Sequence, residues 1–332
     1  MGEKELFDVT IIGGGTTGLF ATYYATMRNL KVKLIESQDQ FGGKVMQFFP
    51  EKLIYDIGGY PDISGDALVK QMVQQASRHQ PVMLTKTWIE TIEKADDHFV
   101  LETLDGARHF TKAVVLATGS GTFHTKKPKN WDDLPFPAYR DIVATNLMDE
   151  GKYEGKDVVI ASNNRQAIVW ALHLEGKAKS VTIVNENDKL QQTREEDIQQ
   201  LENSDAIAYN SATITNLVVD NQQLTAVEIK DHNKQEVRLK ADYMLAYYGL
   251  ALQATPFDAW DVALNKGRIP VKGDMATSVP GIFAAGDVVQ YEGKTNLIAA
   301  GYTEAITAVN KAHKFIDPSV TEQLYSTVLY RK

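Results

Sequence analysis

Three glycines, Gly13, Gly15 and Gly18, lie between a strand-like run and a helix-like run in the segment DVTIIGGGTTGLFATYYA. In that context Gly13 permits a tight turn, Gly15 lets the backbone approach a pyrophosphate, and Gly18 allows close packing of the helix. The helix N-terminus faces the anion, and Glu36 at the end of the next strand can accept hydrogen bonds from ribose hydroxyls. The pattern predicts a dinucleotide site. The alternative is a glycine-rich turn that only packs tightly, and the motif alone does not distinguish FAD from NAD.

The elements that would hold this turn alternate between strand-like and helix-like runs. Strands are predicted at 8–13, 31–36, 113–119, 157–162 and 180–185, and helices at 16–30 and 165–176. Such alternation indicates parallel sheets with crossover helices. The order strand, turn, helix, strand therefore occurs twice along the chain.

Two other segments, 87–119 and 212–247, show short strands around polar turns, which is typical of antiparallel meanders. The predicted fold class is α/β, with two Rossmann-like three-layer domains, each carrying an antiparallel β-meander. We expect the second domain to be inserted into the first. Residues 1–117 and 252–332 would form the FAD-binding domain and residues 118–251 the NAD(P)-binding-like domain.

Length and composition agree with two folded domains. The chain has 332 residues, of which 43% are hydrophobic and 23% charged, and a formal net charge of −8. An acidic balance argues against a general nucleic-acid binder. The first strand begins within a few residues of the N-terminus, and no apolar run approaches the roughly 18 residues of a membrane-spanning helix. We therefore expect a cytoplasmic protein with no membrane partner.

The segments FGGKV, ATG and GIFAAGDVV resemble the FAD domain of flavoprotein reductases that have two dinucleotide-binding domains. The resemblance implies FAD as cofactor, with Asp287 bonded to its ribityl chain or pyrophosphate. The alternative for Asp287 is a turn or N-cap aspartate after a buried strand. Besides the glycine turn and Glu36, the resemblance implies four further cofactor-binding residues, Thr17, Gly43, Lys44 and Gly119.

The segments FFPEKLIYDIGGYPDISGDALVKQM, YEGKTNLIAAGYTEAITAVN and LYSTVLYRK are similar to the thioredoxin-reductase-like class of ferredoxin/flavodoxin-NADP+ reductases, over nearly the whole chain. In that class an aromatic ring stacks on one face of the isoalloxazine, and Phe49 matches its position. A C-terminal ring of the partner subunit covers the other face, which implies a homodimer with Tyr325 in that role and Thr327 among the cofactor-binding residues. Asp56 matches a position near the flavin. The alternatives are hydrophobic packing for both rings and a turn aspartate for Asp56.

Thioredoxin reductases of this architecture pass electrons from FAD through a redox-active pair of cysteines. This chain contains no cysteine, which also excludes disulfides, thiolate metal sites and cysteine nucleophiles. Electrons must therefore leave FAD directly, to ferredoxin, flavodoxin, a small-molecule acceptor or oxygen. No residue is a convincing general acid or base and no metal site is predicted, as expected where the cofactor carries the chemistry.

The second strand–turn–helix segment departs from the class. The resemblance implies a glycine-rich turn and, after the next strand, a basic cluster for the 2'-phosphate of NADPH. At these two places the chain has Ser162, Asn163, Asn164 and Arg165, and then Asn185, Glu186 and Asn187. Asparagine adopts left-handed backbone angles more readily than most residues, so the turn can keep its shape, but its side chains occupy space that a pyrophosphate needs. NADPH and NADH are therefore doubtful ligands.

Several interpretations stay open. Glu186 is either a solvated charge or an acid that binds the ribose of NADH. The basic run at Lys126, Lys127 and Lys129 would steer an acidic ferredoxin or flavodoxin, or belong to a solvated loop. The leading hypothesis is a homodimeric flavoprotein reductase with weakened or lost NADPH use. The alternative is a flavin-binding redox sensor or scaffold without pyridine-nucleotide turnover.

Overall fold

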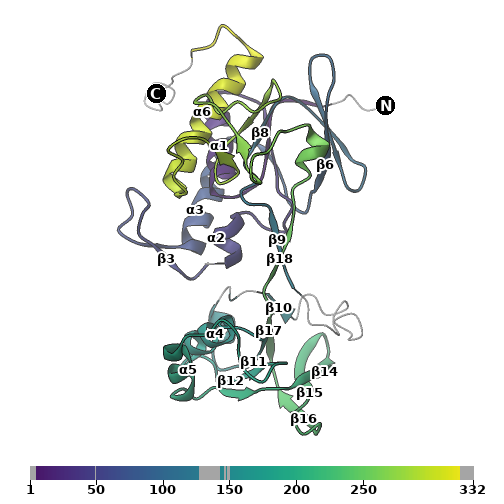
Figure 1. The fold of residues 1–332 in the computed structure, drawn as a ribbon, viewed down its shortest axis with the longest axis vertical. Helices are drawn as coiled ribbons and strands as arrows, with labels where there is room; N and C mark the ends of the chain where they lie inside the picture. Colours follow the sequence, from purple (N-terminus) through teal and green to yellow (C-terminus); the bar gives the residue numbers. More distant parts are fainter. Residues whose placement is uncertain (1–4, 49, 127–142, 146, 148–149, 322–332) are drawn as a thin grey trace. The chain divides into compact units, whose positions relative to one another are not determined.

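The computed structural model describes residues 5–48, 50–126, 143–145, 147 and 150–321. The chain divides into two compact units, one formed by Met1–Thr122 with Gln253–Lys332 and the other by Phe123–Leu252. It passes between them through two strands that pair with each other, β9 (Thr122–Thr125) and β18 (Leu250–Gln253) (Figure 1).

The first unit contains a seven-stranded sheet in the order β5-β2-β1-β8-β7-β6, with β20 also paired to β8. Its strands are β1 (Leu6–Ile12), β2 (Val32–Ile35), β5 (Val82–Leu84), β6 (Ile89–Lys94), β7 (Phe99–Thr103), β8 (Arg108–Leu116) and β20 (Ile282–Ala284). Strands β5, β2, β1, β8 and β20 are parallel. Strands β6, β7 and β8 form an antiparallel meander, as the sequence predicted.

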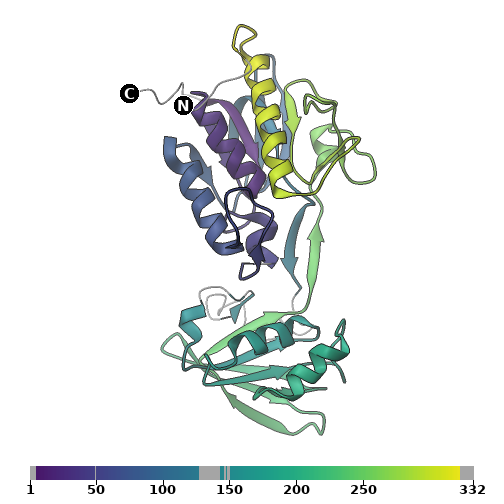
Figure 2. The ribbon, with the colours of Figure 1, turned by 90° about the vertical axis from the view of Figure 1, so that its left-hand side faces the viewer.

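Helix α1 (Thr16–Met27) packs against two other helices of this unit, α3 (Gly65–Ala76) and α6 (Ile298–Ile316). Figure 2 shows α6 in yellow beside α1 in purple. Helix α1 ends at Met27, before Asn29 takes a left-handed φ of 61°, so it is shorter than the predicted 16–30. The remaining elements are short: α2 (Gly43–Phe48), β3 (Leu53–Ile54), β4 (Ile63–Ser64), η1 (Ser77–His79), η5 (Phe257–Trp260), β19 (Ile269–Pro270) and β21 (Val289–Gln290).

The second unit has a five-stranded parallel sheet in the order β10-β17-β11-β12-β13 and an antiparallel meander in the order β14-β15-β16. The parallel strands are β10 (Val143–Ala144), β11 (Asp157–Ser162), β12 (Ser180–Val184), β13 (Ile207–Tyr209) and β17 (Tyr243–Tyr247). The meander contains β14 (Thr213–Asp220), β15 (Gln223–Lys230) and β16 (Glu236–Lys240). Helices α4 (Gln166–Leu174) and α5 (Glu195–Glu202) and the short η4 (Glu150–Tyr153) complete it.

Strand β11 shows how the layers of the second unit form. Its side chains alternate, because successive residues of a strand point to opposite faces. Val158 and Ile160 join the buried cluster that contains α4, whereas Val159 and Ala161 join the cluster of the β14–β16 meander. The sheet is therefore covered by helices on one face and by the meander on the other, in the three-layer arrangement that the sequence predicted (Figure 1).

Candidate functional site

The glycine turn after β1 is closely packed at two of its three glycines. Gly13 has a φ of +106°, and a Cβ atom there would lie 2.4 Å from the Ala117 carbonyl oxygen. A Cβ atom on Gly18 would lie 1.8 Å from the Gly13 carbonyl oxygen. Packing alone thus explains Gly13 and Gly18.

Gly15 needs a different explanation. A Cβ atom on Gly15 would meet one neighbour within 4 Å, the Gly43 Cα atom at 3.9 Å, so packing does not require a glycine. Gly15 is the N-cap of α1, where backbone N–H groups favour an anion. A bare backbone at this place has the room that the close approach of a pyrophosphate requires, and the turn therefore combines tight packing at Gly13 and Gly18 with an open backbone at Gly15.

Glu36 follows β2 and is 6% exposed. Its Oε2 atom accepts a hydrogen bond from the Gly14 N–H at 2.6 Å, and its Oε1 atom accepts one from the Gln38 N–H at 2.8 Å and one from the Ser37 hydroxyl at 3.1 Å. A carboxylate offers about four acceptor positions, so capacity remains for a ribose hydroxyl. The carboxylate is fixed against the glycine turn, in the place where a dinucleotide ribose binds in this kind of fold.

Lys44 connects three segments that are distant in the sequence. Its Nζ atom donates to the Ser120 hydroxyl at 2.7 Å and to Asp287 Oδ2 at 3.0 Å. Gly43 approaches the glycine turn, since a Cβ atom on it would lie 3.0 Å from the Gly15 Cα atom. Residues predicted from separate motifs are thus gathered at the carboxyl ends of β1, β8 and β20, where ligands bind in open α/β sheets. Gly119, with a φ of +63°, turns the chain after β8.

The other predicted residues, of the cofactor site and of the basic run, are either placed by the structure or lie outside the described residues. Thr17 contacts the backbone next to Asp287, because a Cβ atom added to Gly286 would lie 2.8 Å from the Thr17 hydroxyl. Asp56 is exposed in the loop between β3 and β4. Lys126 is exposed. Residues outside the described part of the chain are Phe49, Tyr325, Thr327, Lys127 and Lys129.

The turn after β11 shares several backbone contacts with the turn after β1. The Gln191 N–H donates to the Asn163 carbonyl oxygen at 2.8 Å, as the Gly42 N–H donates to Gly14 at 2.8 Å. Asn185 follows β12 as Glu36 follows β2, and its Oδ1 atom accepts a hydrogen bond from the Asn187 N–H at 3.0 Å. Asn185 therefore occupies in the second unit the position that Glu36 occupies in the first, without its charge.

The side chains of this second turn bond to its own backbone. Asn164 Oδ1 accepts a hydrogen bond from the Gln166 N–H at 3.0 Å, and the Ser162 hydroxyl accepts one from the Asn164 N–H at 3.4 Å. These N–H groups lie at the start of α4, where a nucleotide pyrophosphate would bind. Ser162 is 0% and Asn164 8% exposed. The side chains of the turn thus occupy two N–H groups that would otherwise be free to bind an anion.

The expected left-handed conformation of the asparagines does not occur. Neither Ser162, Asn163 nor Asn164 has a positive φ, whereas Gly13 has one of 106°. The first residue after β11 therefore does not turn as Gly13 does after β1, and asparagine conformation does not preserve the glycine geometry. Our expectation on this point was wrong, because the short polar side chains cap the turn instead of relaxing its backbone.

The positive charge of Arg165, beside the second turn, is paired with helix α5. Arg165 makes a two-pronged ion pair with Asp197 of α5, with Nε–Oδ2 at 2.7 Å and Nη2–Oδ1 at 2.9 Å. The hydrogen bonds from the Arg165 side chain and from the backbone N–H of Arg194 lower the pKa of Asp197 to about 2. Burial, with the nearby charge of Glu186, raises the pKa of Tyr248.

The predicted packing of α4 is confirmed, with Ala167, Trp170 and Ala171 at most 3% exposed.

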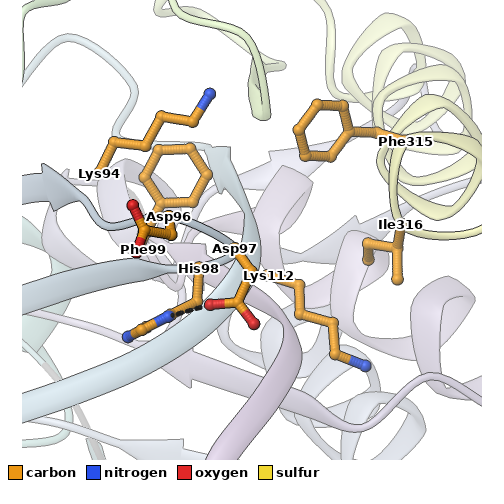
Figure 3. A pocket seen from close by; sticks show the side chains of 8 residues that line it. All are labelled: Lys94, Asp96, Asp97, His98, Phe99, Lys112, Phe315 and Ile316. Carbon is orange, nitrogen blue, oxygen red and sulfur yellow. Dashed lines mark hydrogen bonds and ion pairs between the residues drawn. The ribbon is translucent and has the colours of Figure 1, made fainter.

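A separate pocket of about 260 Å³ lies in the first unit, beside the β6–β7 turn and the end of α6 (Figure 3). His98 Nδ1 and Asp97 Oδ1 pair at its rim at 2.8 Å, and Lys112, which also lines it, pairs with Asp8 at 2.8 Å. It is not at the carboxyl ends of the parallel strands. Within the described ranges, no group of three or more metal-binding side chains occurs, and no helix is long and apolar enough to cross a membrane.

Sequence reasoning missed several residues of these sites. Ser120 and Asp197 gave no local signal, because their partners are distant in the sequence. Glu304, a buried acid that bonds the backbone beside Asp287, had one signal. It is an acidic residue inside the otherwise small and apolar stretch AAGYTEAITAV.

Comparison with known proteins agrees with this geometry. A family model described as "Pyridine nucleotide-disulphide oxidoreductase" matches residues 7–314. The chain is 37% identical over 319 residues to "Ferredoxin--NADP reductase 2" of Shouchella clausii, covering 96% of each protein. It is 36% identical over 341 residues to "Ferredoxin--NADP reductase 2" of Listeria monocytogenes serovar 1/2a, covering 99% of this chain and 100% of that protein.

Solved structures of similar fold include two thioredoxin reductases. That of Lactococcus lactis in the FR conformation has a TM-score of 0.58 at 23% identity and covers 93% of this chain and 99% of that chain. That of T. acidophilum has a TM-score of 0.58 at 25% identity and covers 96% of this chain and 100% of that chain. These similarities confirm the predicted fold class, with two Rossmann-like domains and antiparallel sheets.

Proposed function

This chain belongs to the pyridine nucleotide-disulphide oxidoreductase family and is a flavoprotein oxidoreductase resembling ferredoxin--NADP reductases; from this premise, we propose that it passes electrons from FAD directly to an external acceptor and that its use of NADPH is weakened. The family implies FAD and NAD(P)H use. The two finer statements, on the route of the electrons and on NADPH, rest on features of this chain.

FAD fits the first unit. We assign Gly15 and Glu36, with their open backbone and fixed carboxylate, to the adenosine half and pyrophosphate of FAD. From the resemblance to flavoprotein reductases, we assign Lys44 and Asp287 to the chain that leads to the isoalloxazine. Bound FAD accepts a hydride and can release electrons singly. The protein residues contribute binding and orientation, and the structure assigns no proton transfer to any of them.

The electron route follows from composition. A dithiol relay requires two cysteines, and the full chain has none. The acceptor must therefore approach the flavin itself. We propose ferredoxin, flavodoxin or a small-molecule acceptor, and a homodimeric enzyme, on the basis of the resemblance to ferredoxin--NADP reductases.

The observation that supports weakened nucleotide use is the self-bonded turn after β11. Asn164 and Ser162 hold the two N–H groups that a pyrophosphate would bond. The cationic cluster of the class is also replaced, by Asn185, Glu186 and Asn187. A hydrogen bond to a charged group contributes roughly 1.5 to 3 kcal/mol, so losing two to the 2'-phosphate should weaken NADPH binding by at least ~100-fold. NADH lacks that phosphate and avoids this penalty.

Anaerobic stopped-flow bleaching of the flavin band tests the proposal. We expect slow, weakly saturating reduction by NADPH and reduction by NADH that is no worse. The variant Glu186→Arg with Asn187→Arg should improve NADPH alone, because it adds cations beside the 2'-phosphate. Gln235→Arg with Glu236→Arg, at two exposed residues where β16 begins, makes the same change of charge outside the second turn and the segment after β12, and should alter the binding of neither nucleotide. Rapid saturable reduction of the unmodified protein by micromolar NADPH would contradict the proposal.

The self-bonded turn also favours a second function, a flavin-binding redox sensor or scaffold that does not turn over pyridine nucleotides. The same experiment separates the two. Reduction by either nucleotide, followed by electron transfer to ferredoxin or flavodoxin, supports the enzyme. Failure of both nucleotides, with FAD still bound, supports the sensor or scaffold.

A further inference from the structure

A buried ion pair lies next to Asp287, one of the residues of the candidate FAD site in the first unit. Glu304, in α6, has a side chain that is 4% exposed, and its partner Lys294 has one that is 7% exposed. Glu304 Oε1 accepts hydrogen bonds from Lys294 Nζ at 2.6 Å and from the Tyr291 hydroxyl at 2.7 Å. Burying such a pair costs several kcal/mol of desolvation per ion, so it is weak evidence for a role in stability. The buried pair of Glu304 and Lys294 therefore needs an explanation other than stability.

The second carboxylate oxygen indicates that role. Glu304 Oε2 accepts a hydrogen bond from the Gly286 N–H at 2.7 Å. Gly286 has a φ of +87°, which an L-residue rarely adopts, and a Cβ atom on it would lie 2.8 Å from the Thr17 hydroxyl. The peptide before Asp287 is therefore fixed from two sides, by Thr17 of α1 and by Glu304 of α6.

Helix α6 itself approaches α1 closely at this place. A Cβ atom on Gly301 would lie 2.4 Å from the Thr17 hydroxyl. Gly301 and Glu304 are neighbours on one helical face, because residues three apart lie on the same side of a helix. The start of α1, the turn at Gly286 and the first turns of α6 thus form one packed block, and the Glu304 carboxylate is its hydrogen-bonded centre.

From this geometry, and on the basis of the proposed FAD binding, we propose that Glu304 is a positioning residue. Held by Lys294 and Tyr291, it fixes the Gly286 peptide and so sets the direction of the Asp287 side chain toward FAD. The paired charge of Glu304 serves the cofactor site, and it acts through Asp287 without touching FAD.

Tyr291 is the second donor to the Glu304 carboxylate, beside Lys294. Burial, the hydrogen bond to Glu304 and its negative charge raise the pKa of Tyr291 to about 12. The hydroxyl therefore stays protonated and keeps donating at physiological pH. With the lysine on the same oxygen, the carboxylate is anchored by two donors and presents its second oxygen to Gly286 in one orientation.

The test compares Glu304→Ala and Glu304→Gln with Thr303→Ala, a change at the adjacent exposed residue of α6. The first readout is amide hydrogen exchange of the peptide that contains Gly286 in the apoprotein. The second is the FAD dissociation constant, measured by quenching of flavin fluorescence. We expect faster exchange and at least about tenfold weaker FAD binding in Glu304→Ala, a smaller effect in Glu304→Gln, which keeps one acceptor oxygen, and no effect in Thr303→Ala.

Tyr291→Phe provides a milder variant in case Glu304→Ala does not fold. It removes one anchor of the carboxylate and should raise both exchange and the FAD dissociation constant by a smaller factor. The proposal is overturned if the folded variants exchange as the wild type does, or if they lose thermal stability while the folded protein binds FAD with unchanged affinity. Failure of the wild-type protein to bind FAD would instead refute the proposed function, and the exchange experiment would still test whether Glu304 holds the Gly286 peptide.

Discussion

Removing the side chains that fill the second turn should restore nucleotide binding. In Ser162→Gly with Asn164→Gly, the N–H groups of Asn164 and Gln166 lose their internal acceptors, which lie at 3.4 Å and 3.0 Å. Both N–H groups then become available to a pyrophosphate. Because NADH and NADPH share this group, the variant should bind both more tightly.

The magnitude follows from the two bonds. A hydrogen bond between an N–H group and a charged phosphate contributes roughly 1.5 to 3 kcal/mol. Replacing an asparagine cap by glycine costs only a few tenths of a kcal/mol, and glycine at the buried Ser162 position adds a backbone-entropy cost of roughly 0.5 to 1 kcal/mol. Two restored bonds contribute at least about 3 kcal/mol, and these costs leave a net gain of at least about 1.7 kcal/mol, so we expect at least a ~10-fold lower dissociation constant for each nucleotide.

The assay is anaerobic stopped-flow reduction of the flavin over a range of NADH and NADPH concentrations, which yields an apparent dissociation constant for each. Asn203→Gly, at the exposed C-cap of α5, is the matched control for added backbone freedom in the same unit. Unchanged dissociation constants for both nucleotides would refute the argument that these side chains block the site. Tighter binding of NADPH alone would also refute it, since the pyrophosphate is common to both.

Three other outcomes are expected. The pure protein should not reduce thioredoxin disulfide, because it has no relay thiols, and measurable reduction would disprove the direct electron route. Gly15→Ala should leave the melting temperature of the apoprotein nearly unchanged, since the new Cβ atom meets only one protein atom within 4 Å, but the purified variant should contain less FAD. Gly18→Ala should instead destabilise the fold by about 1 to 3 kcal/mol because of overpacking. Although burial raises the pKa of Asp157, hydrogen bonds from Ser180 and from two lysines lower it to about 2. The stabilisation by the ionised Asp157 is therefore complete above about pH 3.8 and lost as the pH falls through 2. In urea titrations, the free energy of unfolding of Asp157→Asn should be lower than that of the wild type at pH 6, and the difference should shrink between pH 4 and 2.

The sequence signals that predict the first site are local. Gly13, Gly15 and Gly18 lie within one turn, and the strand and helix that flank them have the hydrophobic patterns of their type. The same reasoning detected the missing glycines of the second turn but not what replaced them. That Asn164 caps the Gln166 N–H depends on a backbone conformation that asparagine propensity did not predict.

Contacts between distant segments could not be read from the sequence. The bonds of Lys44 to Ser120 and Asp287 join helix α2 to two loops, and that of Glu304 to Gly286 joins a helix to a turn. Each pairing depends on how the strands are ordered in the sheet and on how closely α6 approaches α1. An acid within an apolar helical stretch indicates a buried partner, but the identity of that partner emerges only from the fold.

The two turns differ in how strongly packing fixes them, and this explains how the second unit can keep its fold while its binding surface changes. In the first unit the helix position of Gly18 excludes a Cβ atom, because one would lie 1.8 Å from a backbone oxygen. The corresponding position in the second unit carries Ala167, which is fully buried with its Cβ atom. Its core depends on Trp170, Leu174 and the alternating residues of β11, none of which belongs to the turn. Serine and asparagine at 162–164 therefore leave that core undisturbed, whereas a side chain at Gly13 of the first unit would meet the Ala117 carbonyl oxygen at 2.4 Å.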